Sequence, residues 1–185
     1  MNLIRKVVWN KILEKAIQLG LKPANVPVNE KERLQEIDNL GLVNRDLKSD
    51  IRFSSLPRLA TYLTSCSQAA INIIGQDTQY CKVSHGNNSA LVYISKKTPR
   101  DISTCSHVLN NNLDPLVIED CSKDDRTKAV FEASGKKSPK FYAGSPIISK
   151  NGFILGTFCV YDDNPRTMSH EQLDGMRLLS DQFVE

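Results

Sequence analysis

The stretch KFYAGSPIISKNGFILGTFCVYDD, residues 140–163, contains two apolar runs separated by Asn151-Gly152. Asparagine and glycine tolerate the positive φ angles that a type I′ hairpin turn requires at both central positions. The dipeptide therefore predicts a two-residue hairpin whose turn fixes the register of both strands. The expected cross-strand pairs are Lys150 with Phe153, Ile148 with Leu155, Pro146 with Thr157, Gly144 with Cys159, and Tyr142 with Tyr161.

Both faces of this predicted hairpin are largely apolar. The paired residues form one face, and the other is formed by Ala143, Ser145, Ile147, Phe158 and Val160. If one face of the strand pair were exposed to solvent, charged residues would alternate with apolar residues along each strand. The pattern therefore predicts a sheet covered on both sides. Gly144 and Gly156 remove side chains from opposite faces, and we expect them to leave room for a ligand or for a packed helix.

The composition fits one core domain with an appendage. The chain has 185 residues, of which 40% are hydrophobic, and no run indicates disorder or a membrane span. Of the net charge of +3, residues 1–22 contribute +4 through five basic residues and one acidic residue, which leaves −1 for the remainder. The main domain therefore offers no basic surface for nucleic acid.

The five cysteines predict a reduced, cytoplasmic protein. They are odd in number, never CxxC-spaced, and no apolar signal segment follows the basic N-terminus. We expect them to fill core space, and the spacing predicts neither a disulfide framework nor a metal site. They lie at positions 66, 81, 105, 121 and 159.

The N-terminal region, residues 1–28, is expected to be an amphipathic helix and a linker. Apolar residues recur at helical spacing over residues 3–19, the helix is expected to end near Gly20, and prolines punctuate residues 22–27. Its apolar stripe is suited to packing on the domain or on a second copy. The basic face and Trp9 also suit a membrane surface.

The region from residue 29 to 185 alternates helical and strand-like segments. Asn29 is the expected cap of a helix over residues 29–42, with Glu32 completing a capping box, and Pro57 is tolerated in the first turn of a helix over 54–65. Within residues 98–109, a helix of about two turns is expected after a cap at Asp101 or Ser103, and it carries Cys105 and His107. Strands are expected over 67–75, 80–85, 91–95 and 115–119, a short helix or loop over 121–128, and a connection over 134–139.

A last helix is expected from Ser169 to the final residue. Ser169 is its cap, and its apolar stripe is Leu173, Met176, Leu179 and Phe183. No C-terminal stop signal follows it. We therefore expect the natural polypeptide to continue as a signalling helix into another domain.

Taken in order, several of these segments resemble the GAF domains of bacterial signalling proteins. The resemblance lies in EKERLQEIDNLGL (30–42), TPRDISTCSHVL (98–109), DPLVIED (114–120), KFYAGSPI (140–147), GFILGTFCVYDDNPR (152–166) and SHEQL (169–173). It covers residues 29–185 and implies an α+β fold with an antiparallel sheet of five to six strands. The terminal helices would lie on one face and a ligand pocket on the other. Such domains often form homodimers through their terminal helices and precede histidine kinase or diguanylate cyclase domains.

The candidate ligand-binding residues are Cys105, His107, Asp120, Arg126, Phe141 and Tyr142. Related photoreceptors attach a bilin to a cysteine that directly precedes a histidine, whereas Ser106 separates the two here, and haem binding would need one histidine such as His107. The acidic residues and Arg126 after residue 119 suit either a polar ligand or a solvated loop. Phe141 and Tyr142 must face opposite sides of the sheet, so one ring packs in the core and the other can border a pocket. The sequence does not name a cofactor.

The resulting hypothesis is a non-enzymatic sensory or regulatory domain that binds a small molecule or a partner and signals through its terminal helices. One alternative is a dimerisation scaffold without a ligand. A second is a thiol enzyme similar to free methionine sulfoxide reductases, near one of whose cysteines Cys105 falls. The sequence has no Ser/His/Asp set, phosphate loop or HExxH motif, so it identifies no catalytic residue.

Overall fold

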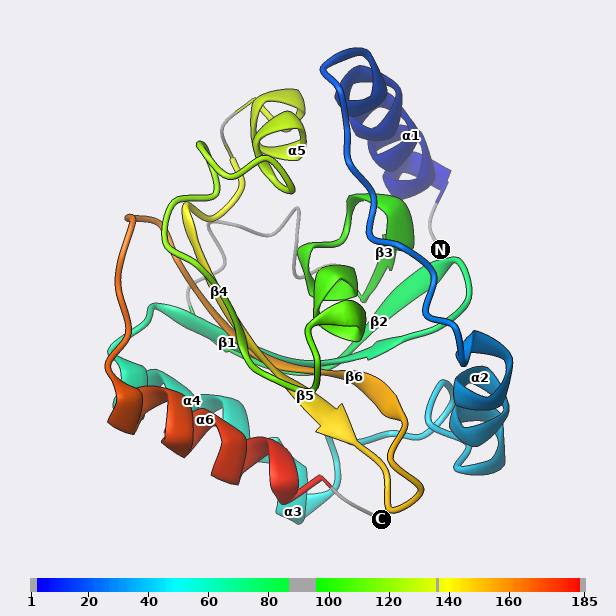
Figure 1. The fold of residues 1–185 in the computed structure, drawn as a ribbon, viewed down its shortest axis with the longest axis vertical. Helices are drawn as coiled ribbons and strands as arrows, with labels where there is room; N and C mark the ends of the chain where they lie inside the picture. The colour runs from blue at the N-terminus through cyan, green and yellow to red at the C-terminus, as the bar shows by residue number, and fades with distance from the viewer. Residues whose placement is uncertain (1–2, 87–95, 136, 184–185) are drawn as a thin grey trace.

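A six-stranded antiparallel sheet forms the centre of the molecule (Figure 1). The structure is a computed structural model that describes residues 3–86, 96–135 and 137–183. The strand order is β3-β2-β1-β6-β5-β4, and every neighbouring pair is antiparallel. The strands are β1 (Gln68–Ile74), β2 (Thr78–Gly86), β3 (Lys97–Pro99), β4 (Leu116–Ile118), β5 (Phe141–Ile148) and β6 (Ile154–Asp162).

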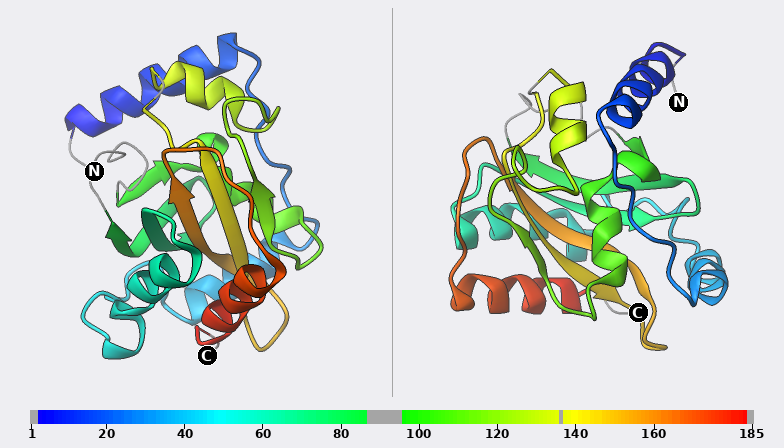
Figure 2. Two further views of the ribbon diagram at one scale, coloured as in Figure 1. Left: turned by 90° about the vertical axis from the view of Figure 1, so that its left-hand side faces the viewer. Right: turned by 45° about the horizontal axis from the view of Figure 1, so that its top comes forward.

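Helices and turns cover both faces of this sheet, as the apolar pattern on both faces predicts (Figure 2). One face carries α3 (Ile51–Ser54), α4 (Leu56–Thr64) and α6 (His170–Asp181), and α2 (Glu30–Asn39) lies beside one end of β6. The opposite face is covered by two 3-10 helices and by the polar segment that follows β4. These helices are η2 (Arg100–Ile102) and η3 (Thr104–Asn110), and beyond them lie α5 (Lys128–Ala133) and α1 (Leu3–Gln18).

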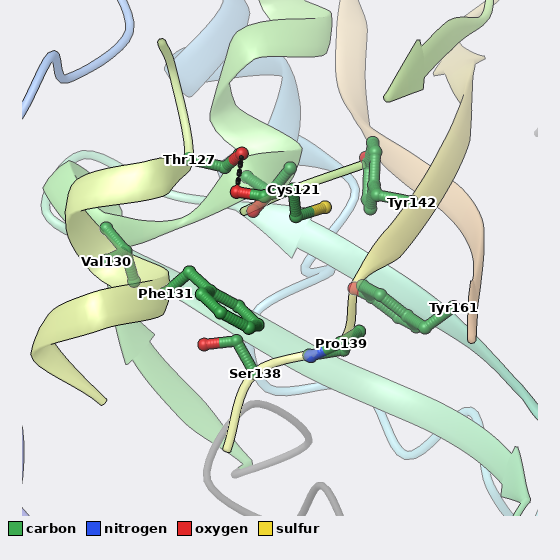
Figure 3. A pocket seen from close by; sticks show the side chains of 9 residues that line it. Cys121, Thr127, Val130, Phe131, Ser138, Pro139, Tyr142 and Tyr161 are labelled. Carbon is green, nitrogen blue, oxygen red and sulfur yellow. Dashed lines mark hydrogen bonds between the residues drawn. The ribbon is translucent and has the colours of Figure 1, made fainter. Parts of the chain in front are cut away.

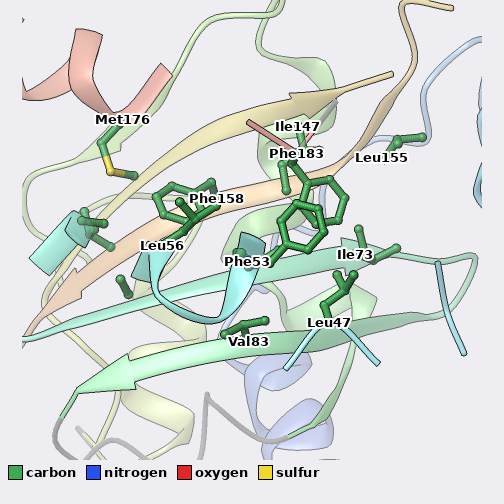
Figure 4. Close-up of a cluster of buried hydrophobic side chains, with 14 of the residues drawn as sticks. Leu47, Phe53, Leu56, Ile73, Val83, Ile147, Leu155, Phe158, Met176 and Phe183 are labelled. Carbon is green, nitrogen blue, oxygen red and sulfur yellow. The ribbon is translucent and has the colours of Figure 1, made fainter. Parts of the chain in front are cut away.

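The larger core lies between the sheet and the α4/α6 layer (Figure 4). Its centre is aromatic, with the Phe53 and Phe183 rings 4.9 Å apart between centroids. Burial of these apolar surfaces is the main force that holds the helices to the sheet. Its large members are Ile37, Leu42, Leu47, Phe53, Leu56, Ile71, Ile73, Phe141, Ile147, Leu155, Phe158, Met176 and Phe183.

The central hairpin forms, but its turn differs from the prediction. The turn backbone closes with the Gly152 N–H donating to the Ser149 carbonyl (2.9 Å), and φ is positive at Gly152 but not at Asn151. A type I′ turn needs positive φ at both positions, so this is a three-residue loop with glycine in the left-handed position. Ile148 consequently pairs with Ile154, not with Leu155.

A β-bulge next to Ile148 restores the predicted register for the rest of the hairpin. Tyr142 lies opposite Tyr161, Gly144 opposite Cys159, and Pro146 opposite Thr157, as the sequence predicts. The extra residue turns Leu155 toward the α4/α6 face, where it joins the larger core, and Ile154 takes its place on the other face. The bulge therefore corrects a one-residue offset that would otherwise invert the faces of β6.

The two hairpin glycines do not leave the room that the sequence suggests. A side chain at Gly144 would collide with the Tyr142 hydroxyl, because the Tyr142 ring lies over that glycine. A side chain at Gly156 would collide with the backbone of Asn72 on β1. The first glycine makes room for a tyrosine and the second allows two strands to approach.

Several helix predictions need correction. The helix expected over residues 98–109 is two 3-10 helices separated by Ser103, whose side chain makes no capping hydrogen bond. Asn29 precedes α2, but neither it nor Glu32 forms the expected capping box. Ser169 does cap α6, in a capping box completed by Gln172. The expected strand over 91–95 lies outside the described residues, and α5 was not anticipated.

The N-terminal helix α1 packs on the domain. Trp9, Ile12 and Ala16 form a small separate core with Ile102 of η2 and Val130 of α5. This contact places α1 on the side of the sheet opposite α6 (Figure 1). Of the helical residues that the structure describes, none belongs to a helix long and apolar enough to cross a membrane.

Candidate functional site

A small cavity lies between α5 and the sheet face that carries Tyr142 and Tyr161 (Figure 3). Its volume of about 20 Å³ is enough for one water molecule. The wall is apolar and aromatic on two sides, with hydroxyl and thiol groups between them. The lining residues are Thr104, Cys121, Thr127, Val130, Phe131, Ser138, Pro139, Tyr142 and Tyr161.

The segment between β4 and α5 forms the upper wall of this cavity. The Cys121 N–H donates to the Lys140 carbonyl (2.6 Å), and the Thr127 hydroxyl donates to the Cys121 carbonyl (2.8 Å). Asp120 fixes the turn by accepting from the Ser122 N–H (3.0 Å). Burial raises the Cys121 pKa to about 12, so this thiol is neutral at pH 7.

A polar cluster of two thiols, a phenol and an amide lies next to the cavity, inside the sheet core. The Cys105 sulfur is 3.9 Å from the Cys159 sulfur and 3.4 Å from the Tyr161 hydroxyl oxygen. The Cys159 thiol donates to the Tyr161 hydroxyl (3.1 Å). The Asn72 side-chain amide donates to both sulfurs, at 3.5 Å for Cys105 and 3.1 Å for Cys159.

These groups do not ionise alike. Burial is the largest influence on the Cys105 thiol and opposes its ionisation, but the polar groups of Cys159, Thr157, Tyr161 and Tyr142 outweigh burial and lower its pKa to about 6. Burial and the neighbouring Cys105 raise the pKa of Cys159 well above its ordinary value. Burial likewise raises the pKa of Tyr142 and of Tyr161. The first proton to leave this cluster therefore comes from Cys105.

Three buried polar atoms around these thiols have no hydrogen-bond partner among the described residues. They are the Asn72 side-chain oxygen, the Tyr142 hydroxyl and the Thr157 hydroxyl. Asn72 and Thr157 are opposite each other on β1 and β6. Unpartnered buried polar atoms cost free energy, so a cluster of them indicates a place where a small polar molecule can bind.

The structure brings together some of the residues that the sequence singles out. Cys105 and Tyr142 meet in the polar cluster, and Tyr142 also lines the cavity. His107 points elsewhere, toward the Asp124–Arg126 pair. Burial and the Arg126 guanidinium lower the His107 pKa to about 4, so its ring is neutral at pH 7.

The remaining candidates make local contacts. Arg126 forms a two-point ion pair with Asp124 (2.9 and 2.6 Å), and the Asp120 carboxylate is occupied by Ser122 and Lys123. Phe141 is fully buried in the core on the opposite face, away from the cavity. Among the described residues, no three His, Cys, Asp or Glu side chains are grouped closely enough to hold a metal ion.

Sequence reasoning missed Tyr161, Cys159 and Asn72 as members of the cluster. A signal for the first two was present, since the predicted register places Tyr161 opposite Tyr142 and Cys159 opposite Gly144. Asn72 had no such signal. It is a single polar residue within an apolar strand, and only the pairing of β1 with β6 brings it to the thiols.

A buried ionic group near the start of α2 was also not anticipated. Arg33 is 1% exposed and donates to the carbonyls of Ile74 (2.7 Å) and Ile154 (3.3 Å), while its other nitrogens pair with Glu30. The same carboxylate accepts from Arg100. The group ties α2 and η2 to the strands.

An open groove of about 260 Å³ lies beside this ionic group and includes Arg33. The three side-chain nitrogens of Arg33 are already hydrogen-bonded, so we favour the cavity under α5 as the candidate ligand site.

A two-sided antiparallel sheet, with helices on one face and short helical segments over the other, defines a class of small α+β domains. Residues 52–184 match the GAF domain family, and the chain belongs to it. A cyclic di-GMP phosphodiesterase of Pseudomonas aeruginosa is 28% identical over 141 residues, which are 76% of this chain and 22% of the relative. The chain thus spans about a fifth of that protein's length.

Solved structures share the fold at low identity. The chromophore-binding domain of a Stigmatella aurantiaca bacteriophytochrome has a TM-score of 0.58 and 10% identity, covering 84% of this chain and 59% of that one. A type II free methionine-R-sulfoxide reductase from Thermoplasma acidophilum has a TM-score of 0.54 and 14% identity, covering 71% and 89%. GAF domains are typically sensory or regulatory modules of signalling proteins, and the majority are not catalytic.

Proposed function

We propose that this chain is a non-enzymatic sensory domain in which a small molecule enters the cavity under α5 and the terminal helices relay its binding. One observation carries the proposal: the same short helix faces both the cavity and α1. Val130 lines the cavity and also belongs to the small core that holds Trp9 and Ile12 of α1.

The size of the cavity makes binding and movement inseparable. At about 20 Å³ it accepts one water molecule, so a metabolite or chromophore must displace α5 or the aromatic rings of Phe131 and Tyr142. A ligand that binds only the displaced arrangement shifts the protein toward it. Movement of α5 then disturbs the contact of Val130 with α1.

A second route runs through β5 to α6. Tyr142 of β5 lines the cavity, and Ser145, three residues along the strand, exchanges a hydrogen bond with Ser180 of α6 (2.9 Å). We propose that α6 leads into an output domain such as a histidine kinase or a diguanylate cyclase. The phosphodiesterase relative adds cyclic di-GMP turnover to the plausible outputs. The five free cysteines favour a cytoplasmic location.

Thermal unfolding of the full chain with cyclic GMP, cyclic di-GMP, haemin and biliverdin tests the proposal. A ligand that binds the folded state raises Tm by mass action. The same ligand is expected to slow alkylation of Cys121 in the cavity and to leave unchanged the alkylation of Cys66, which is buried on the opposite face.

A pair of matched variants locates the site. Cys121→Leu fills the cavity and is expected to abolish the ligand-induced rise in Tm. Cys66→Leu makes the same substitution in the core on the other face and should leave the ligand-induced rise in Tm unchanged. If both variants keep the rise, the ligand binds elsewhere. If none of the four compounds raises Tm, the scaffold alternative is favoured.

The scaffold alternative has support of its own. Apolar side chains remain exposed on the outer surfaces of α4 and α6, at Leu59, Tyr62 and Leu178. In that alternative, the chain pairs through these helices and has no ligand.

The thiol reductase alternative predicts turnover of free methionine sulfoxide with dithiothreitol as the reductant, and Cys105→Ser should abolish this turnover. Absence of turnover in the reduced wild type excludes this alternative.

A further inference from the structure

Two thiols from separate elements touch inside the sheet core. Cys105 lies on η3 and Cys159 on β6, their sulfurs are 3.9 Å apart, and their side chains are 1% and 0% exposed. A disulfide needs a sulfur separation of about 2.05 Å, so the atoms must approach by about 2 Å. Cys105 belongs to a short 3-10 helix at the sheet surface, and that segment can move toward β6 more easily than a central strand can move toward it.

We propose that Cys105 and Cys159 form a peroxide-sensitive dithiol that is oxidised to an internal disulfide. This modification site is independent of any ligand in the cavity. Two of the other three cysteines are placed less favourably: Cys66 lies on the opposite face of the sheet, and Cys121 is hydrogen-bonded into the turn after β4 through its backbone. The third, Cys81, packs at the edge of the same buried cluster and is partly exposed.

The surroundings of Cys105 favour its thiolate as the nucleophile. The Asn72 amide donates to its sulfur, and the Tyr161 hydroxyl lies within hydrogen-bond distance of it. Both contacts become stronger when the sulfur carries a negative charge. The Cys159 thiol donates a hydrogen bond to the Tyr161 hydroxyl and stays protonated, which suits the thiol that reacts second.

The cluster also offers hydrogen-bonding groups that a peroxide needs. The Asn72 side-chain oxygen can accept a hydrogen bond from the peroxide O–H, and the hydroxyls of Tyr142 and Thr157 can donate hydrogen bonds to a peroxide oxygen. The adjacent cavity is water-sized and is bordered by Tyr142 and Tyr161. The Tyr161 hydroxyl is 3.4 Å from the Cys105 sulfur, so the cavity lies one side chain away from the thiol, and its size favours an oxidant as small as hydrogen peroxide.

The chemistry balances with hydrogen peroxide as the oxidant. The Cys105 thiolate attacks one peroxide oxygen, an S–O bond forms, the O–O bond breaks, and the departing hydroxide takes up the proton released by the thiol to give water. The Cys159 thiol then attacks the Cys105 sulfenic acid, the S–S bond forms, and the hydroxyl leaves as a second water. Two thiols lose two electrons and two protons in total.

Peptide mapping of the full chain after hydrogen peroxide treatment tests this pairing. The expected product has lost two hydrogen atoms, contains one disulfide between the peptides of Cys105 and Cys159, and returns to the starting mass with dithiothreitol. Cys105→Ser and Cys159→Ser should both prevent this link, and Cys66→Ser and Cys121→Ser should retain it. In Cys159→Ser, the reaction should stop at a Cys105 sulfenic acid, so the peptide that contains Cys105 should gain one oxygen atom.

Peptide mapping of the wild type shows whether Cys105 and Cys159 form the disulfide even if a serine variant fails to fold. The proposal is wrong if peroxide oxidises the partly exposed Cys81 while Cys105 and Cys159 remain fully alkylatable after denaturation. A link between any other pair of cysteines would also overturn it. The mapping is done without any added ligand, so its result and the result of the ligand-binding experiment can be told apart.

Discussion

At the scale of single residues, Gly144 decides where the Tyr142 ring lies. The tyrosine is fully buried and extends along its own strand over the glycine, so a methyl group at position 144 would collide with its hydroxyl. We expect Gly144→Ala to lower the free energy of unfolding by about 1 to 3 kcal/mol, the usual cost of over-packing a tight core. Urea denaturation followed by circular dichroism measures the change.

The double variant Tyr142→Phe/Gly144→Ala provides the control for this collision. Removal of the hydroxyl relieves the closest contact and leaves that with the ring carbon, so the double variant should lose less stability than the two single variants together. Additive effects would mean that the collision with the hydroxyl is not the cause.

Glu30 is the second residue whose effect can be predicted. Its carboxylate serves both buried arginines, and Glu30→Gln leaves Arg33 and Arg100 without a counter-charge. We expect a loss of about 2 to 3 kcal/mol in the free energy of unfolding at pH 7. Glu32→Gln, an exposed position on the same helix, is the matched control and should change little.

The loss should depend on pH in a defined direction. Burial opposes ionisation of Glu30, but the hydrogen bonds from Arg33 and Arg100 outweigh it and lower its pKa below 4.5. The folded form therefore keeps the charge at pH values where the unfolded form has taken up a proton, and the stabilisation is lost as pH falls below 4.5. The difference between wild type and Glu30→Gln should shrink below that pH, and a constant difference would contradict the assignment.

At the scale of elements, the sequence predicted the kinds of strand and their pairing better than it predicted the turns. The positions of apolar residues and of Asn-Gly predicted the central hairpin and its two buried faces. They also predicted which residues pair in the part of the hairpin away from the turn. The turn was harder to predict, because a two-residue loop and a three-residue loop can both contain Asn151-Gly152 and differ in length by one residue. The bulge beside Ile148 compensates for that difference, and no local signal in β6 marks it.

The elements that sequence analysis missed depend on distant contacts. Helix α5 is only six residues long, and its apolar residues are divided between the cavity and α1. Such a helix is marginal without tertiary packing, so periodicity is a poor guide to it. No local pattern in the sequence marks Arg33 as buried. Its burial follows from the carbonyls of Ile74 and Ile154 that the folded sheet offers it.

Helix α1 offers a test of how an element is held. Trp9 is buried against η2 and α5, whereas Val8 beside it is exposed. Trp9→Ala should weaken the packing of α1 against η2 and α5 by about 3 to 5 kcal/mol. We expect this loss to release α1 from the domain. We expect faster tryptic cleavage after Lys11 and Lys15 with a much smaller change in the urea midpoint. Val8→Ala should leave cleavage unchanged, and equal protection of both variants would mean that Trp9 does not anchor the helix.

At the scale of the whole molecule, the helices on both sides of the sheet expose apolar side chains. On the cavity side α1 exposes Ile17 (60%), and the α4/α6 layer presents Leu59 (49%), Tyr62 (65%) and Leu178 (67%) to solvent. The two helices are neighbours, and Gly175 of α6 lets the Leu63 side chain of α4 approach closely. An apolar surface shared by two adjacent helices is suited to a second copy of the chain, since a symmetric dimer uses the same patch twice.

This arrangement predicts how the oligomeric state responds to charge. We propose that two copies pair symmetrically through this patch. Leu178→Glu would then place two like charges in the interface and remove apolar area, and we expect the dissociation constant of the dimer to rise at least tenfold, or about 1.4 kcal/mol. Sedimentation velocity over a range of concentrations measures it. Ile17→Glu, an equally exposed apolar position on α1, is the control, because α1 lies on the other side of the sheet. If Ile17→Glu dissociates the dimer and Leu178→Glu does not, the copies meet through α1, and the signal would pass through the cavity face and not through α6.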